Sequence, residues 1–319
     1  MVKSLVLKFV CLLIALLVFV PNLAACVAAT AGNSTPLLPS DFENTPVPDV
    51  NLGGYIYLNQ GSSITIPTDL LPTNANPISI KSAQLWLGPD VNSVGGAISF
   101  ESQADAQVVS QLIKSYKAPV WSLASSNIIY AANNDSGQWT SSLKNAVTRQ
   151  QMVSIASKYP EVTSDFAYFP SAPPSKPFAA GFIDLDSNLI ESISTSLGLS
   201  LADYTAALKS AKISRVCFVI YSAQSLKVSS ETITEDYINS LQLGVIALGR
   251  STYPGITLSI FFDKAMSDAG FTKYSVDNVD LYKYSLEGIE LLVAHKGNVI
   301  YATAAKSEGL AEKLLLSCF

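Results

Sequence analysis

The sequence contains one histidine in 319 residues, and only 14% of its side chains are charged. A single imidazole excludes a metal site built from several histidines. The net charge of −5 argues against a nucleic-acid-binding protein, because phosphate backbones attract basic surfaces. At 49% hydrophobic residues the chain is not a disordered one. Its length accommodates one or two domains, each with a buried core.

Common catalytic motifs are also missing from the sequence. It contains no Gly-x-Ser-x-Gly elbow and no glycine-rich loop of the nucleotide-binding kinds. His295, the only candidate for a histidine general base, precedes Lys296-Gly297-Asn298, which is typical of a tight turn between strands. The sequence therefore favours a surface histidine at a turn. We expect no cofactor and lean towards a protein that is not an enzyme.

The N-terminus has the anatomy of a secretory signal peptide. Lys3 and Lys8 form a positive region, and an unbroken apolar run follows from Phe9 to Val20. Twelve helical residues span only about 18 Å, which is short of the roughly 30 Å hydrocarbon core of a bilayer. Pro21-Asn22 then ends the run.

Leu23, Ala24, Ala25 and Cys26 follow this run, and they resemble the lipobox of bacterial lipoproteins. The resemblance covers only the first 26 residues. It implies diacylglyceryl transfer to the Cys26 sulfur, cleavage before Cys26 and acylation of the new amino group by a fatty acid such as palmitate. Two or more acyl chains bind a bilayer durably, at about 0.8 kcal/mol per buried CH₂, whereas one chain binds marginally.

Three other interpretations of this segment stay open. Ordinary secretory cleavage could fall after Ala28, and the stretch from Phe9 to Ala31 could remain as an uncleaved anchor. Cys26 could also be a chance cysteine. Removal of residues 1–25 leaves 18 basic and 25 acidic side chains. Anionic lipids repel such a chain, so we expect the anchor alone to make the membrane contact.

Composition divides the chain into five segments. Residues 1–25 are the predicted signal peptide, and residues 26–51, rich in Pro, Ser and Thr, are a predicted tether without a core. Residues 52–159 and 178–319 are predicted α+β modules. Residues 160–177 contain five prolines and are a predicted Pro-rich linker or long loop.

The hydrophobic pattern predicts an α+β fold, with mixed or antiparallel sheets and flanking helices. The main strand candidates are 78–87, 95–100, 119–123, 127–132, 180–184, 213–222, 243–248, 256–262, 279–284, 289–295 and 299–302. The helix candidates are 104–116, 136–158, 189–197, 201–208, 234–241 and 306–316.

One segment of the chain echoes another at an offset of 171 residues. Asn127–Ala131 (NIIYA) aligns with Asn298–Ala302 (NVIYA), and Leu143 then aligns with Leu314. A duplicated strand–turn–helix unit would mean two related modules. The alternative is that any such unit selects these residue types.

Cys217 and Cys318 are the cysteines of the exported body, and they are candidates for a disulfide because an exported protein meets an oxidising compartment. Two unrelated thiols are the alternative. In both cases these residues indicate structure and not catalysis.

Asp184, Asp186 and Asn188 begin like a calcium loop. Leu189 stands where such a loop needs glycine, and Thr195 where it needs glutamate. They are a weak metal candidate, and the alternative is an acidic cap for a following helix.

The sequence thus predicts an exported lipoprotein of the cell envelope, most simply a non-catalytic binding or interaction module. Its expected location is the outer face of the cytoplasmic membrane or a periplasm-facing membrane, and a secreted protein is the alternative. The expected partners are the membrane, through the lipid, and other envelope proteins, with no nucleic acid. A solute-binding subunit of a transporter and an envelope hydrolase using Asp or Glu remain alternative functions.

Overall fold

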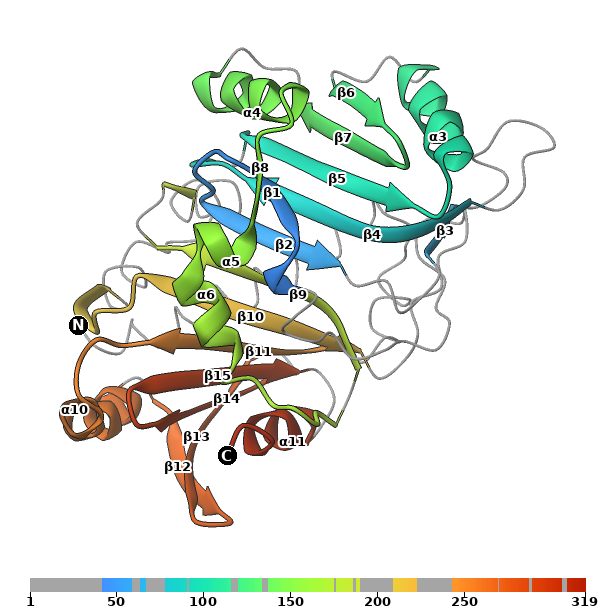
Figure 1. Cartoon of the computed structure of the whole chain (residues 1–319). Coiled ribbons are helices and arrows are strands. Elements are labelled where there is room, and N and C mark those ends of the chain that lie inside the picture. Colours follow the sequence, from blue (N-terminus) through green and yellow to red (C-terminus); the bar gives the residue numbers. More distant parts are fainter. Residues whose placement is uncertain are drawn as a thin grey trace.

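The fold is known from a computed structural model. It describes residues 42–58, 64–66, 78–90, 92–115, 120–133, 137–174, 176–185, 188–189, 209–222, 243–268, 270–286, 289–305 and 309–319. Within these ranges the chain builds one large antiparallel sheet with helices on both faces (Figure 1). The α+β class predicted from the sequence is therefore confirmed.

The described part of the large sheet has thirteen strands, in the order β12-β13-β14-β15-β11-β10-β9-β2-β4-β5-β7-β6, with β3 beside β4. Their bounds are β2 Gly54–Leu58, β3 Ile64–Ile66, β4 Ile78–Leu87, β5 Val94–Phe100, β6 Val120–Ser125, β7 Ile128–Asn133, β9 Lys176–Asp184, β10 Arg215–Ser222, β11 Leu243–Arg250, β12 Thr272–Val276, β13 Val279–Leu286, β14 Ile289–Lys296 and β15 Val299–Ala305. A separate two-stranded sheet pairs β1 (Pro46–Pro48) with β8 (Met152–Ser154).

Six helices accompany the sheet in the described residues: α3 Gln103–Ser115, α4 Gln138–Thr148, α5 Ile155–Lys158, α6 Pro160–Phe166, α10 Gly255–Asp268 and α11 Leu310–Leu316. Strand β10 shows why helices are needed on both faces. Phe218 and Ile220 pack into one core, and Cys217 and Val219 into the core on the other face. A strand buried on both faces is apolar throughout, which is why β10 was prominent in the sequence.

Two units of the sheet have the same topology. In chain order the first unit is β2, β4, β5, α3, β6, β7 and α4, and the second is β9, β10, β11, α10, β14, β15 and α11. Their strands lie in the spatial orders β2-β4-β5-β7-β6 and β9-β10-β11-β15-β14. Among the described strands the units differ in two places: the first also contains β3, beside β4, and the second contains the hairpin β12–β13, inserted between α10 and β14.

Matching contacts occur at the hairpin turns of the two units. The side chain of Asn127 donates to the carbonyl oxygen of Phe100 (2.6 Å), and the side chain of Asn298 donates to that of Ser251 (2.8 Å). In return, the N–H groups of Phe100 and Ser251 donate to the two asparagine carbonyls (2.8 and 2.9 Å). The residues before the asparagines, Ser126 and Gly297, both have φ near +60°. The sequence echo therefore reflects a repeated structure.

The two leucines of the echo also occupy matching places. Leu143 of α4 and Leu314 of α11 are fully buried in the same core. Leu143 packs against Gly95 of β5, and Leu314 packs against Gly244 of β11, so closely that a Cβ atom at either glycine would overlap the leucine. Glycine thus allows each helix to approach the third strand of its unit closely.

The first strands of the units, β2 and β9, pair antiparallel and make the two units one sheet. Antiparallel pairing of equivalent strands relates the units by an approximate two-fold axis perpendicular to the sheet. The positions of the helices agree with this two-fold axis. The equivalent helices α4 and α11 pack into one core, and the equivalent helices α3 and α10 pack on the opposite face of the sheet.

The described structure corrects the predicted tether, which extended to residue 51. Phe42 and Val47 are fully buried, and β1 pairs with β8. Phe42 packs between the rings of Tyr55 and Phe166 (5.5 and 4.3 Å between centroids). The prediction failed because these two apolar residues stand among prolines and polar residues, where no periodicity reveals them.

The predicted strand 256–262 is also wrong, because this segment lies in helix α10. Its apolar residues alternate like those of a strand, but Leu258, Phe262 and Met266 recur at every fourth position and form the buried face. The predicted helix 136–158 is divided into α4, β8 and α5. The proline-rich segment 160–177 contains α6, with Val162 and Phe166 buried.

Candidate functional site

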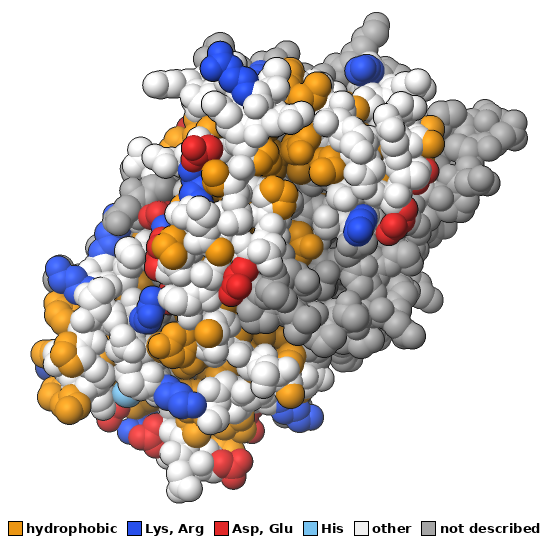
Figure 2. All heavy atoms as spheres, in the orientation of Figure 1, with side chains coloured by type: hydrophobic (Ala, Val, Ile, Leu, Met, Phe, Trp, Pro, Cys, Tyr) orange, Lys and Arg blue, Asp and Glu red, His pale blue; other side chains and the backbone are white. Residues whose placement is uncertain are grey.

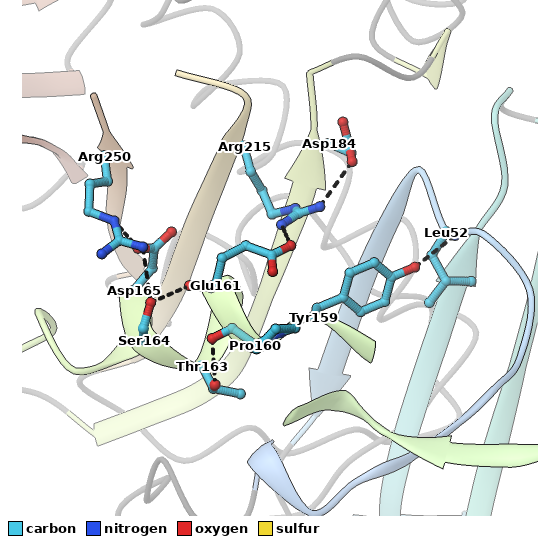
Figure 3. A network of polar contacts seen from close by, with 10 residues as sticks. All are labelled: Leu52, Tyr159, Pro160, Glu161, Thr163, Ser164, Asp165, Asp184, Arg215 and Arg250. Atoms are coloured by element: carbon cyan, nitrogen blue, oxygen red, sulfur yellow. Dashed lines mark hydrogen bonds and ion pairs between the residues drawn. The ribbon is translucent and has the colours of Figure 1, made fainter. Parts of the chain in front are cut away.

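The most extensive polar network that the structure places between distant parts of the chain surrounds α6 (Figure 3). Arg215 and Arg250 extend from neighbouring strands of the sheet, and Glu161 and Asp165 come from the helix. Asp184 belongs to β9, directly opposite Arg215 in the ladder. The network therefore joins the connection between the two units to one face of the second.

Arg215 lies at the centre of the network. Its guanidinium forms ion pairs with Glu161 and with Asp184 (3.1 Å), and only 12% of its side chain is exposed. The same group lies over the rings of Tyr159 and Phe182, 5.3 and 5.1 Å from their centroids. Charge pairing and cation–π contact together compensate for its desolvation.

The second arginine, Arg250, binds the C-terminal half of α6. Arg250 Nε lies 2.7 Å from Asp165 Oδ1, and its Nη2 donates to the hydroxyl of Ser164 (3.0 Å). The side chain of Asp165 is 8% exposed. The positive charge of Arg250 thus compensates the burial of Oδ1, although no donor among the described residues is aligned for a hydrogen bond to it.

Burial and pairing have opposite effects on the two carboxyl groups of α6. Burial raises the pKa of Asp165, although Arg250 and Arg215 oppose the shift. Burial also acts to raise the pKa of Glu161, but hydrogen bonds from its own backbone N–H and from Arg215 outweigh it and lower that pKa. These groups neutralise the arginines, so the network offers no free cation to an anionic ligand.

Tyr159 extends the network to the N-terminal part of the chain. Its hydroxyl accepts a hydrogen bond from the backbone N–H of Leu52 (3.0 Å), just before β2. Nearby, Lys158 pairs with Asp49 (2.6 Å). The chain that enters the first unit is thus fastened to the segment that leaves it.

Cys217 and Cys318 are both free thiols in the structure, so the disulfide considered for them is not formed there. Cys217 is fully buried, and burial raises the pKa of its thiol well above the ordinary value. Burial likewise raises the pKa of Cys318 to about 12, and its Sγ lies 3.7 Å from the carbonyl oxygen of Leu314. Neutral thiols are poor nucleophiles, so neither cysteine is activated for catalysis.

His295 lies at the end of β14, in edge contact with the ring of Phe262 (4.7 Å between centroids). Its Nδ1 is buried and has no hydrogen-bond partner in the part of the chain that the structure describes. In a Ser-His-Asp arrangement an acceptor at Nδ1 orients the histidine base, and none of the described residues provides one at His295. The position before the β14–β15 turn agrees with the sequence prediction, but the side chain is half-buried and not, as predicted, at the surface.

The weak calcium candidate is only partly contained in the described residues. Asp184 is committed to Arg215, Asn188 is exposed, and Asp186 lies outside the described residues. Among described residues, no group of three or more His, Cys, Asp or Glu side chains is placed to hold a metal ion.

Sequence reasoning missed the α6 network altogether. Its members come from five separate stretches between Leu52 and Arg250, and no spacing links them. One feature of the sequence could have indicated the network: an arginine stands at one end of each of two apolar strands, at Arg215 and at Arg250. A charge there needs a partner once the strands are buried.

Apolar side chains gather on the surface over α10 (Figure 2). Ile256, Ile260 and Phe261 are 80%, 68% and 66% exposed. No helix in the described residues is long and apolar enough to cross a membrane. Cys26, the cysteine of the lipobox-like sequence, precedes the described part of the chain, which begins at Phe42.

Comparison with known proteins gives little similarity. No family model matches the chain, and no curated protein matches it in sequence. Among solved structures, the one titled "Structure of crystal form I of TP0453" is similar at 8% identity, over 87% of this chain and 99% of that one. Its TM-score is 0.37, which is too low to support an argument about function.

Proposed function

We propose that this protein is an exported, lipid-anchored component of a bacterial cell envelope, and that it acts as a non-catalytic binding or interaction module. The observation that carries the proposal is the sequence Leu23-Ala24-Ala25-Cys26 directly after a signal-peptide-like segment. The acyl chains would attach at Cys26. The body behind them is the two-unit sheet.

The distance between anchor and body supports this arrangement. Phe42 is already part of the core, sixteen residues after Cys26. An extended chain covers at most about 3.5 Å per residue, so the body stays within roughly 55 Å of the lipid. A module held so close to a membrane meets other envelope components in two dimensions.

The polar groups of the structure favour binding over catalysis. Asp263 and Asp280 share Lys273 (3.1 and 2.7 Å), and the pKa of each carboxyl is lowered. Such carboxylates are ionised at neutral pH and cannot serve as a general acid. Asp165 has a raised pKa but is buried beneath Arg250. The exposed apolar side chains of α10 are, in contrast, typical of an interaction surface.

A transporter's solute-binding subunit is a weaker alternative. We would expect such a protein to have two lobes built on parallel sheets. Every pairing between described strands is antiparallel, and the sheet is continuous across the two units. The topology therefore favours the interaction module.

The decisive experiment is the intact mass of the mature protein from its native membrane, measured beside Cys26→Ala. We expect a mature chain that begins at an acylated Cys26, and an unprocessed variant that is no longer retained through lipid. A mature chain that begins after Ala28 without lipid mass would refute the anchor. Crosslinking in intact cells then tests the second part: recovery of neighbouring envelope proteins supports an interaction module.

A further inference from the structure

Strand β6 ends the sheet on the side of the first unit (Figure 1). Among the described strands, β7 is its only partner. Its sequence, VWSLAS, contains no charged residue and no proline. Exposed strand edges normally carry such residues because they prevent pairing with another chain.

The hairpin fixes which backbone groups of β6 point outward. Ser126 and Asn127 form a two-residue turn, so Ser125 and Ile128 are a hydrogen-bonded pair. Hydrogen-bonded pairs alternate along an antiparallel ladder. The N–H and C=O groups of Val120, Ser122 and Ala124 therefore point away from β7.

The second unit shows what such an edge can bind. At the 171-residue offset, Val120 and Ser122 correspond to Leu291 and Val293 of β14. These two pair with Tyr284 and Tyr282 of the added strand β13. The second unit thus supplies a strand at the edge that stays open in the described part of the first unit.

We propose that the outer edge of β6 is a strand-pairing surface whose occupant is β6 of a second copy of this chain. The absence of charged residues from β6 favours this occupant, because an uncharged strand can pair with a second copy of itself without placing like charges opposite each other. The chain already uses the same geometry internally, where the equivalent strands β2 and β9 pair antiparallel about a two-fold axis. Pairing between copies continues that sheet.

One register engages all three outward residues of β6. It places Ser122 opposite Ser122 of the second copy, and Val120 opposite Ala124. Ser125 then lies three residues beyond the axis, so its two copies are separated by about 20 Å, at 3.3 Å per residue. The pair of serines provides a matched test.

The first experiment oxidises the full chain, extracted in mild detergent, as Ser122→Cys and as Ser125→Cys. Both variants keep the native cysteines. We expect an interchain disulfide that mass spectrometry maps to position 122 in the first variant, at least tenfold more abundant than any bond at position 125 in the second. Equal crosslinking of the two variants, or none, overturns the proposal.

The second experiment measures association by sedimentation. We expect the wild-type chain to dimerise with rising concentration, and Ser122→Asp to raise the dissociation constant at least tenfold while the melting temperature stays within a few degrees. A wild-type chain that is monomeric at all concentrations overturns the proposal. So does a dimer that Ser122→Asp leaves unchanged, because another surface then forms it.

Discussion

Replacing Gly181 by alanine tests the close contact that joins the two units. Gly181 lies in β9, opposite Ile56 at the middle of β2. A Cβ atom at this position would lie 2.1 Å from the carbonyl oxygen of Tyr55, 2.8 Å from Phe218 Cζ and 3.1 Å from Ile56 Cα. The nearest obstacle is backbone, which cannot rotate away as a side chain can.

The geometry sets the expected size of the effect. Carbon and oxygen atoms of neighbouring strands approach to about 3.3 Å, so β2 and β9 would have to separate locally by roughly 1 Å. Overfilling a packed core costs about 1–3 kcal/mol, and we expect the upper end here, about 3 kcal/mol. At roughly 2–4 °C per kcal/mol for a body of this size, the melting temperature should fall by about 10 °C.

Gly54→Ala is the matched control, because Gly54 lies in the same ladder, opposite Ile183. A Cβ atom there meets its nearest neighbours at 3.2 Å, so we expect a change below about 1 kcal/mol. Urea and thermal unfolding of both variants measure the difference. If Gly181→Ala unfolds within about 1 kcal/mol of Gly54→Ala, the argument that this contact requires glycine is refuted.

Three further predictions concern the α6 network and the repeated turns. Arg215→Met should lower the free energy of unfolding by about 2–3 kcal/mol in urea titrations, because it removes the ion pairs of a largely buried arginine with Glu161 and Asp184. Lys273→Met, at an exposed ion pair, should cost less than about 1 kcal/mol, and equal costs would contradict the central place of Arg215. The pKa of Glu161 is lowered from 4.5, so its contribution to stability is present above pH 4.5 and lost at lower pH. The urea midpoint of the wild type should therefore fall more steeply below pH 4.5 than that of Glu161→Gln. Asn127→Ala and Asn298→Ala should each lower the free energy of unfolding by about 1–2 kcal/mol. Because the two asparagines lie in different units, the effects should add in the double variant to within about 0.5 kcal/mol. Strong coupling between them in urea unfolding would contradict this prediction.

The local parts of the fold could be predicted from the sequence. The strand predicted at 78–87 coincides with β4, and the helix predicted at 104–116 is α3 shifted by one residue. These segments have a clear period and distinct ends. The turns at Asn127 and Asn298 were also visible, because each asparagine begins a repeated five-residue sequence.

The arrangement of these parts could not be predicted. Pairing of β2 with β9 joins residues more than 120 positions apart, and nothing in either strand identifies the other. Helix α10 was missed because its apolar residues fit a strand as well as a helix, and only packing against the sheet decides. The α6 network depends on both, since Arg215 and Glu161 meet only after the sheet and the connection are in place.

Under the proposed lipid anchor, the position of this network would give it a mechanical role. A force on the proposed lipid anchor would reach the described part of the chain at Phe42 and pass through β1, which has three residue pairs with β8. Beyond β1, Asp49 is bound to Lys158, and Leu52 to Tyr159, whose ring lies under Arg215. The load would thus spread from the first unit into the second before it reaches β2. An ion-paired arginine over an aromatic ring suits this task, because it joins three elements through one rigid group. Under this proposal, the network would fasten the segment that enters the first unit to the rest of the body, rather than form a site of chemistry.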